Sequence, residues 1–424
     1  MPHLPTQATL SAMKKIDYDL HAPPYRKQLD IARFITEPKQ LEHYIDTLLH
    51  SSEIEWIAID TEFVRRDTYY PELSLIQICD ALGNLALIDP ICIEQASGRQ
   101  ALLPIKQLME AEHIRKVFHS ARQDIEVLFT IEQCLPKNVF DTQIAALFLG
   151  HGDLAGFGRV IKAELHIALE KSQTCTNWHA RPLSNKQLQY ALDDVFYLAP
   201  LYQHLLRHLN SEQIQAVMDE TAQILKPEIY AINPQDAWHK VKGLKALKPK
   251  QLAIVQALAA WREDYAITHN KPKKWTLSDD VIVAIAKRPP KVKEALYKVP
   301  SIKSSSVKEF GSEWITLIDQ VFERPSQSYP QVEAKPAKAS EEEEILFSLL
   351  NGYALQIAQT YGINWTNLTH RDELLQFIRH PNETRRPGWR EYLFFQPARL
   401  ILAGQTGLMI QNNKLTLVTN PTRL

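Results

Sequence analysis

Five short apolar segments between residues 55 and 142 constrain the fold of this chain more than any other feature. They are EWIAIDTEF, LSLIQICDAL, NLALIDP, KVFHS and NVFDT. Each has the length of a strand, and the first two partly alternate apolar and polar residues. The first three are joined by short turns, and the later ones alternate with helical patterns such as ARQDIEVLFTIEQ. This order predicts an α/β fold with a mixed sheet and flanking helices.

The rest of the chain divides at two places. The segment PSQSYPQVEAKPAKASEEEE (residues 325–344) has few large apolar residues, so we expect a linker there. A second boundary lies near residue 226, where KPEIYAINPQD places two prolines between helical patterns. The predicted parts are an N-terminal extension (1–30), the α/β domain (31–225), a mainly helical domain (226–324), the linker (325–344) and a second mainly helical domain (345–424). That last part ends in GLMIQNNKLTLV, which predicts a hairpin turning at Asn412 and Asn413.

The charge is concentrated in the first helical domain. Between Asp236 and Phe310 the chain carries sixteen Lys and Arg against seven Asp and Glu, a local charge of +9 in a chain of net charge −1. A basic domain on an acidic body favours a polyanionic partner. No apolar run is long enough for a membrane span and none near the start resembles a signal peptide, so we expect a cytoplasmic protein without a membrane partner.

Asp60 and Glu62 are the first candidates for chemistry. In the predicted strand WIAIDTEF they are two residues apart, so both side chains point to the same side of the sheet. Two carboxylates so close are costly unless a cation lies between them, and oxygen ligands favour Mg²⁺ or Mn²⁺ over zinc. The alternative is an ordinary solvated pair of surface acids.

Three further residues complete the candidate set. Tyr190 and Asp194 lie four residues apart on a predicted helix that begins after Ser184, so they share one helix face. Asp124 lies in the first turns of a helix for which Ser120 and Gln123 predict a capping box. The alternatives are a buried tyrosine beside a solvated acid, and an acid that only stabilises its helix.

Taken together, these residues suit a two-metal site. All four acids fall at the ends or starts of predicted elements of one sheet. Two Mg²⁺ ions about 4 Å apart can clamp the attacking and leaving oxygens of an in-line phosphoryl displacement. A tyrosine hydroxyl beside them can orient the attacking water.

The motifs around these residues resemble the ribonuclease D family, which belongs to the DEDD exonuclease superfamily and has a ribonuclease-H-like fold. They are DTEF from Asp60, HSARQD ending at Asp124, and YALDD with Tyr190 and Asp194. The stretches RRDTYYPELSLIQI, FDTQIAALFLG and RPLSNKQLQYALDDV are also similar to the family, and the resemblance covers about residues 30–210. The spacing is that of the tyrosine subclass, because the histidine subclass would have His where this chain has Gln189.

The resemblance implies a role for each motif residue. Asp60 would bridge two divalent metal ions, Mg²⁺ or Mn²⁺, while Glu62 and Asp194 hold the ion on the nucleophile side. Asp124 would support the second ion, and Tyr190 would position the water. The implied reaction is 3′→5′ hydrolysis of RNA to 5′-mononucleotides, with tRNA precursors and other structured RNAs as the expected substrates.

The resemblance extends to RNA contacts outside the metal site. Phe63 would pack against the terminal base, or else belongs to the core. The basic domain resembles the helicase-and-ribonuclease-D C-terminal (HRDC) domain, in which Lys273 and Lys274 would contact phosphates, unless they only form a solvated basic face. The last domain is similar to a second HRDC domain, and no contact is assigned to it.

The segment TCTNWHARPL departs from the family pattern. It has Asn177 where the family has Asp, and His179 and Ala180 where the family varies around Ser and Arg. We expect these departures to affect how the substrate is handled. Two other functions remain open on sequence alone: a DNA 3′→5′ exonuclease, since contacts to the 2′-hydroxyl decide between RNA and DNA, and a catalytically silent RNA-binding scaffold.

Overall fold

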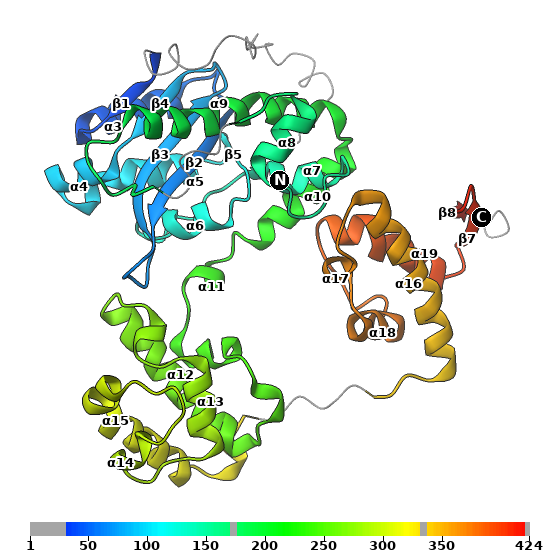
Figure 1. Ribbon diagram of the computed structural model, residues 1–424. Helices are drawn as coiled ribbons and strands as arrows, with labels where there is room; N and C mark the ends of the chain where they lie inside the picture. Colours follow the sequence, from blue (N-terminus) through cyan, green and yellow to red (C-terminus); the bar gives the residue numbers. More distant parts are fainter. Residues whose placement is uncertain (1–30, 170–175, 331–336, 420–424) are drawn as a thin grey trace. The chain divides into compact units, whose positions relative to one another are not determined.

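A computed structural model describes residues 31–169, 176–330 and 337–419 of the chain (Figure 1). The predicted N-terminal extension, residues 1–30, lies outside the described residues. The chain forms two compact units. The first contains residues up to Phe63, Leu73–Lys226 and the segment from Pro336 onward, and the second contains Val64–Glu72 and Pro227–Lys335. In the described part of the chain, no helix is long and apolar enough to span a membrane.

The first unit is built on a six-stranded sheet in the order β1-β4-β3-β2-β5-β6. The strands are β1 (Arg33–Ile35), β2 (Trp56–Val64), β3 (Glu72–Asp80), β4 (Leu85–Ile88), β5 (Arg115–Phe118) and β6 (Val139–Asp141). β3 and β4 are antiparallel, whereas β1–β4, β2–β5 and β5–β6 are parallel. The predicted mixed sheet is therefore confirmed. β1 was not predicted, because it has only three residues. Two of them, Arg33 and Phe34, are exposed, so the strand has no apolar pattern.

Helices flank this sheet as predicted. They are α3 (Pro38–His50), α4 (Pro90–Ser97), α5 (Leu103–Glu110), α6 (Arg122–Leu128), α7 (Thr142–Leu147), α8 (Phe157–Glu164), α9 (Asn185–His208) and α10 (Ser211–Gln223), with a short 3₁₀ turn, η1 (Arg99–Leu102), before α5. The long helix α9 crosses the sheet and packs against both β4 and β5 (Figure 1). Side chains on the N-terminal half of α9 therefore lie next to the middle of the sheet.

The second unit is a helical domain around one apolar core. Its elements are α11 (Pro227–Tyr230), η2 (Pro234–Lys240), η3 (Leu244–Ala246), α12 (Pro249–Thr268), η4 (Lys273–Trp275), α13 (Asp279–Lys287), α14 (Lys293–Leu296), α15 (Ser304–Glu323) and η5 (Ser326–Ser328). Trp314 of α15 is fully buried among apolar residues of α12 and α13, such as Leu258 and Ile285. The prediction of a mainly helical basic domain agrees with this architecture.

The C-terminal segment is also mainly helical and belongs to the first unit. It contains α16 (Glu341–Tyr361), α17 (Trp365–Leu368), α18 (Arg371–Arg379), η6 (Glu391–Phe395), α19 (Gln396–Leu402), β7 (Thr406–Gln411) and β8 (Lys414–Thr419). α16 starts inside the predicted linker because Ser340 and Glu343 form a capping box. The predicted hairpin is confirmed, since β7 and β8 pair antiparallel and both turn residues, Asn412 and Asn413, have positive φ.

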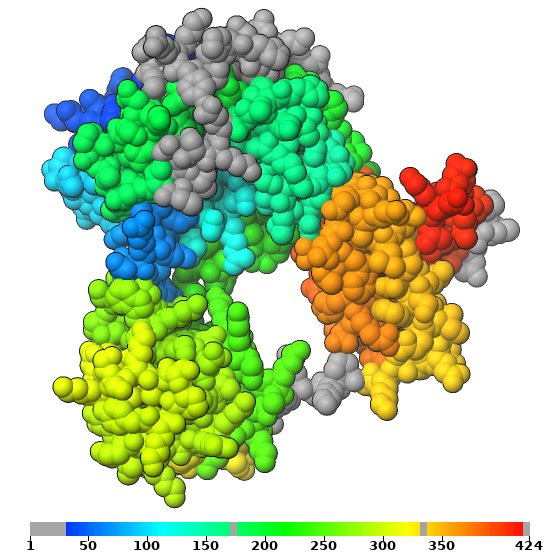
Figure 2. All heavy atoms as spheres, viewed as in Figure 1, coloured from blue at the N-terminus to red at the C-terminus, as the bar shows by residue number. Residues whose placement is uncertain are grey.

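The C-terminal segment and the α/β body lie side by side in Figure 2. Backbone atoms of the two approach each other closely. A Cβ atom on Gly152 would overlap the carbonyl of Gly362, and a Cβ atom on Gly388 would lie 2.9 Å from the Cα of Glu220 in α10. The carboxylate of Glu220 also pairs with Arg390 at 3.5 Å. Gly152 and Gly388 therefore fit where a larger residue cannot.

Replacement of Gly388 by Ala tests this attachment. Its φ of +93° already disfavours a side chain, and the added methyl would collide with α10. Gly404→Ala is the matched control, because Gly404 has a φ of +70° and open space around it. We expect urea unfolding to show a loss of about 1 kcal/mol for the control and about 2–4 kcal/mol for Gly388→Ala. Equal losses would contradict the steric explanation.

Candidate active site

Three carboxylates meet where β2 and α9 approach each other. Asp60 and Glu62 come from β2 and Asp194 from α9, and one oxygen from each residue lies within 4.8 Å of the others. The alternation of β2 places the first two on one side. The predicted capping box of Ser184 and Gln187 is present and fixes the start of α9, and hence the position of Asp194.

Asp124 is the fourth acid and is buried in the first turn of α6. Its carboxylate accepts a hydrogen bond from the Thr61 hydroxyl at 2.6 Å, which ties it to the strand that carries Asp60 and Glu62. The sequence analysis missed Thr61, because nothing in an alternating strand marks one hydroxyl as the partner of a distant acid.

The predicted capping box of Ser120 and Gln123 is wrong. Ser120 has a φ of 65°, and α6 has Ala121 at its N-cap without a side-chain cap. The carboxylate of Asp141 takes over this role, since it accepts hydrogen bonds from the backbone N–H groups of Ser120 and Ala121, both at 2.9 Å. Asp141 lies at the end of β6, so the start of α6 is held by a neighbouring strand.

The four acids destabilise one another's charged forms. Burial is the main cause that raises the pKa of Asp60 and Asp124 well above the usual range, and neighbouring carboxylates add to it. The same causes raise the pKa of Glu62 to about 10 and that of Asp194 to about 8. Hard divalent cations prefer such oxygen ligands and would offset this repulsion, so the residues fit a divalent metal site.

Tyr190 lies beside this cluster on the same face of α9. Its hydroxyl hydrogen-bonds to the carboxylate of Asp194, which lowers the pKa of that group against the other influences. The neighbouring acid Asp193 is turned elsewhere, because its carboxylate accepts a hydrogen bond from the Gln189 side chain at 2.8 Å. The structure thus brings Asp60, Glu62, Asp124, Asp194 and Tyr190 together.

The remaining predicted residues lie at different places. Phe63 follows Glu62 on β2 and is half-buried. Lys273 and Lys274 lie in η4 of the second unit. The ammonium of Lys273 pairs with buried Glu263 at 3.2 Å, whereas Lys274 is exposed.

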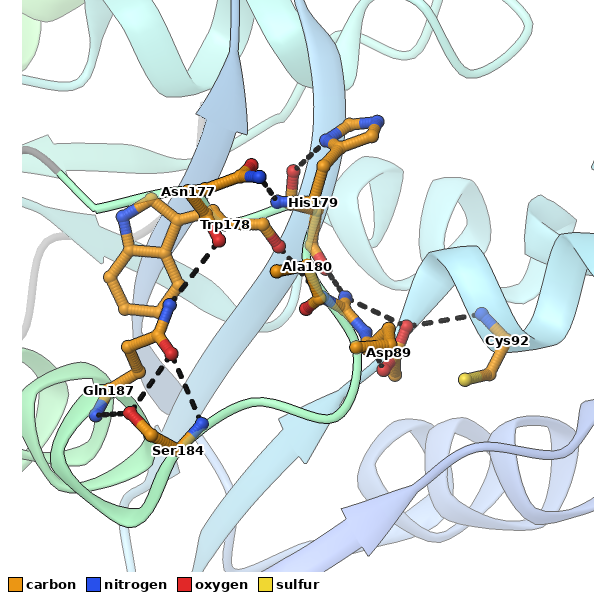
Figure 3. A network of polar contacts seen from close by, with 10 residues as sticks. Asp89, Cys92, Asn177, Trp178, His179, Ala180, Ser184 and Gln187 are labelled. Carbon is orange, nitrogen blue, oxygen red and sulfur yellow. Dashed lines mark hydrogen bonds and ion pairs between the residues drawn. The ribbon is translucent and has the colours of Figure 1, made fainter.

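The segment before α9 contains a polar network that the sequence analysis did not foresee (Figure 3). Arg181 pairs with buried Asp89 through two hydrogen bonds of 2.6 and 3.0 Å, and it also donates to the backbone carbonyls of Trp178 and Ser74. The Trp178 ring lies 6.1 Å from that of Tyr190. The network therefore shapes the wall of the site next to the tyrosine.

The departure from the family pattern at Asn177 fits this network. The side-chain oxygen of Asn177 accepts a hydrogen bond from the backbone N–H of His179 at 3.1 Å (Figure 3). A carboxylate oxygen of Asp can accept the same hydrogen bond. Asn177 therefore preserves the local turn.

Comparison with known proteins agrees with this geometry. A family model described as 3'-5' exonuclease matches residues 32–210, and one described as HRDC domain matches residues 251–318. Ribonuclease D of Bartonella henselae is 34% identical over 389 residues, which cover 90% of this chain and 93% of that protein. Ribonuclease D of Pseudomonas paraeruginosa is 32% identical over 78% of this chain and 87% of its own length.

A solved structure extends the similarity to the whole architecture. The crystal structure of Escherichia coli RNase D, described as an exoribonuclease involved in structured RNA processing, superimposes with a TM-score of 0.73 at 27% sequence identity. The match covers 88% of this chain and 99% of that one. An identity above 30% over nearly the full length of a curated relative, together with the match to the 3'-5' exonuclease family model, shows that this chain belongs to the ribonuclease D family and is a 3′→5′ exoribonuclease.

Proposed function

We propose that Asp60, Glu62, Asp124 and Asp194 hold two divalent ions, Mg²⁺ or Mn²⁺, and that this site trims the 3′ ends of structured RNAs, tRNA precursors among them. The observation that carries the proposal is the group of acids around Asp60. One oxygen of Asp60 lies within 4.8 Å of oxygens of Glu62 and Asp194, and its charge also raises the pKa of Asp124. In this proposal Asp60 contributes to both sets of ligands.

The side chains of the site have separate tasks in this proposal. When bound, the two ions supply a positive charge that activates water and neutralises the phosphate. The Tyr190 hydroxyl donates a hydrogen bond to Asp194, so its oxygen is left to accept a hydrogen bond from the attacking water. Thr61 holds Asp124 by its 2.6 Å hydrogen bond, which keeps the carboxylate directed at the cluster.

The RNA contacts rest on the charge and exposure of the residues concerned. Lys274 is exposed in a domain with a local charge of +9, which supports a contact to backbone phosphates. Phe63 follows Glu62 on β2 and is half-buried, and in this proposal its ring packs on the terminal base. The proposed parts are the nuclease domain (31–225), the HRDC domain (226–324) and a second HRDC-like domain, whose first helix α16 begins at Glu341, inside the segment predicted as a linker (325–344).

Adjacent acids of α9 offer a matched test of the site. Asp194→Asn removes a proposed metal ligand, and we expect it to reduce the release of mononucleotides from RNA by about a thousandfold or more. Asp193→Asn changes the same chemical group one position away, at a carboxylate that accepts a hydrogen bond from Gln189 and is not a proposed metal ligand, and we expect turnover within about threefold of the parent. If Asp194→Asn degrades RNA as fast as the parent, the assignment of the site is wrong.

Removal of the metal tests the repulsion between the acids. In EDTA we expect Asp60→Asn to unfold at the same or a higher denaturant concentration than the parent, because one crowded carboxylate is gone. Mg²⁺ at a hundred times its Kd should stabilise the parent by about 2.7 kcal/mol and leave Asp60→Asn unchanged. Equal stabilisation of both proteins by Mg²⁺ would place the ion elsewhere.

Salt dependence tests the contact of the basic domain. Lys274→Ala should weaken the binding of a long RNA, and the slope of log K against log salt should fall in magnitude by about 0.7–0.9 for the one lost phosphate contact. Asp194→Asn serves as the background in this assay, so that the RNA stays intact. An unchanged slope would assign Lys274 to a solvated face.

A further inference from the structure

Residues Val64–Glu72, the hairpin tip, connect the end of β2 to the start of β3. They belong to the same compact unit as the HRDC domain. The strands are neighbours in the sheet and are joined by too few residues for a crossover, so they form a hairpin. At this tip the backbone N–H groups of Tyr69 and Tyr70 both donate to the side-chain oxygen of Asn270, at 3.0 and 3.1 Å. One amide oxygen of the HRDC domain thus holds two consecutive residues of the tip.

A second contact lies beside the first. The Tyr69 hydroxyl donates to a carboxylate oxygen of Glu263 at 2.5 Å. Glu263 is 1% exposed, and the ammonium of Lys273 neutralises it at 3.2 Å and lies 5.7 Å from the centre of the Tyr69 ring. A carboxylate is costly to bury without partners, and here a cation and a phenol hydroxyl serve as its partners. Tyr69 therefore binds at a buried polar site and not at an exposed surface.

Both strands of the hairpin lead from the tip into the candidate site. On β2, Glu62 lies two residues before the tip. On β3, Ser74 lies two residues after it, and its hydroxyl and carbonyl bond to His179 and Arg181. His179 follows Trp178 in the segment before α9 (Figure 3). Arg181 lies two residues further on, and the ring centre of Trp178 lies 6.1 Å from that of Tyr190.

We propose that the hairpin tip is a latch, in which Tyr69 and Asn270 are positioning residues that let the HRDC domain hold Glu62 and the wall beside Tyr190 in place for hydrolysis. The proposal rests on the assignment of Asp60, Glu62 and Tyr190 to the site. It gives the HRDC domain a part in turnover that is separate from any contact with RNA. A shift of about 1 Å in a reacting group can cost about a hundredfold in rate, so a loose tip lowers kcat.

Variants of Asn270 provide the test. Asn270 has a φ of 47°, which Gly adopts without strain, so Asn270→Gly removes only the amide that receives the tip. Asn270→Asp keeps an oxygen acceptor and is the conservative partner. Tyr69→Phe removes the second contact, and Tyr329→Phe is its control, because the Tyr329 hydroxyl bonds to the Val321 and Arg324 carbonyls within the HRDC domain.

The readout is kcat and KM for mononucleotide release from a short single-stranded RNA by the full-length protein with Mg²⁺. We expect kcat to fall about tenfold in Asn270→Gly and about threefold in Tyr69→Phe, with KM within about twofold of the parent. Asn270→Asp and Tyr329→Phe should stay near the parent, and thermal unfolding should be similar in all four.

Two results would overturn the latch. One is a parental kcat in both Asn270→Gly and Tyr69→Phe, and the other is a rise in KM at constant kcat, which would make the tip a binding element. Failure of the site assignment is recognised separately, because Asp194→Asn would then remain active. If Asp194→Asn is inactive while Asn270→Gly and Tyr69→Phe keep the parental kcat, the latch is rejected and the site assignment stands.

Discussion

Repulsion among four carboxylates is the constraint on which the rest of the nuclease domain depends. Asp60, Glu62, Asp124 and Asp194 are brought together although burial and mutual charge raise the pKa of each. A fold tolerates such a group only when the surrounding structure holds the carboxylates in place and a bound cation offsets their repulsion. The nearby hydrogen bonds serve this purpose, from Thr61 on Asp124 to the capping box that starts α9.

Features local in sequence could be predicted, whereas features that depend on distant partners could not. The strands from β2 to β6, the capping box at Ser184 and the turn at Asn412 and Asn413 follow from short patterns, and all are present. The capping box predicted at Ser120 is wrong, because Asp141 of β6 accepts the backbone hydrogen bond at the start of this helix instead. The Arg181–Asp89 pair joins positions 92 residues apart and has no local pattern.

The candidate site shows the same division. Strand and helix periodicity paired Asp60 with Glu62 and Tyr190 with Asp194, whereas the roles of all five motif residues came from the resemblance to the ribonuclease D family. Lys273 was assigned to RNA from the resemblance to the HRDC domain and the local charge, and no pattern in the sequence indicates that buried Glu263 pairs with it. The expected effect of Asn177 on substrate handling stays a prediction, and the structure adds that its side-chain oxygen accepts the hydrogen bond of the local turn.

The most direct test of the account is anomalous diffraction from crystals soaked in Mn²⁺. The account predicts two Mn²⁺ sites that share Asp60, one completed by Glu62 and Asp194 and the other contacting Asp124, with both lost in crystals of the Asp60→Asn variant. Mn²⁺ bound away from these carboxylates, or no Mn²⁺ at them in an active enzyme, would contradict it.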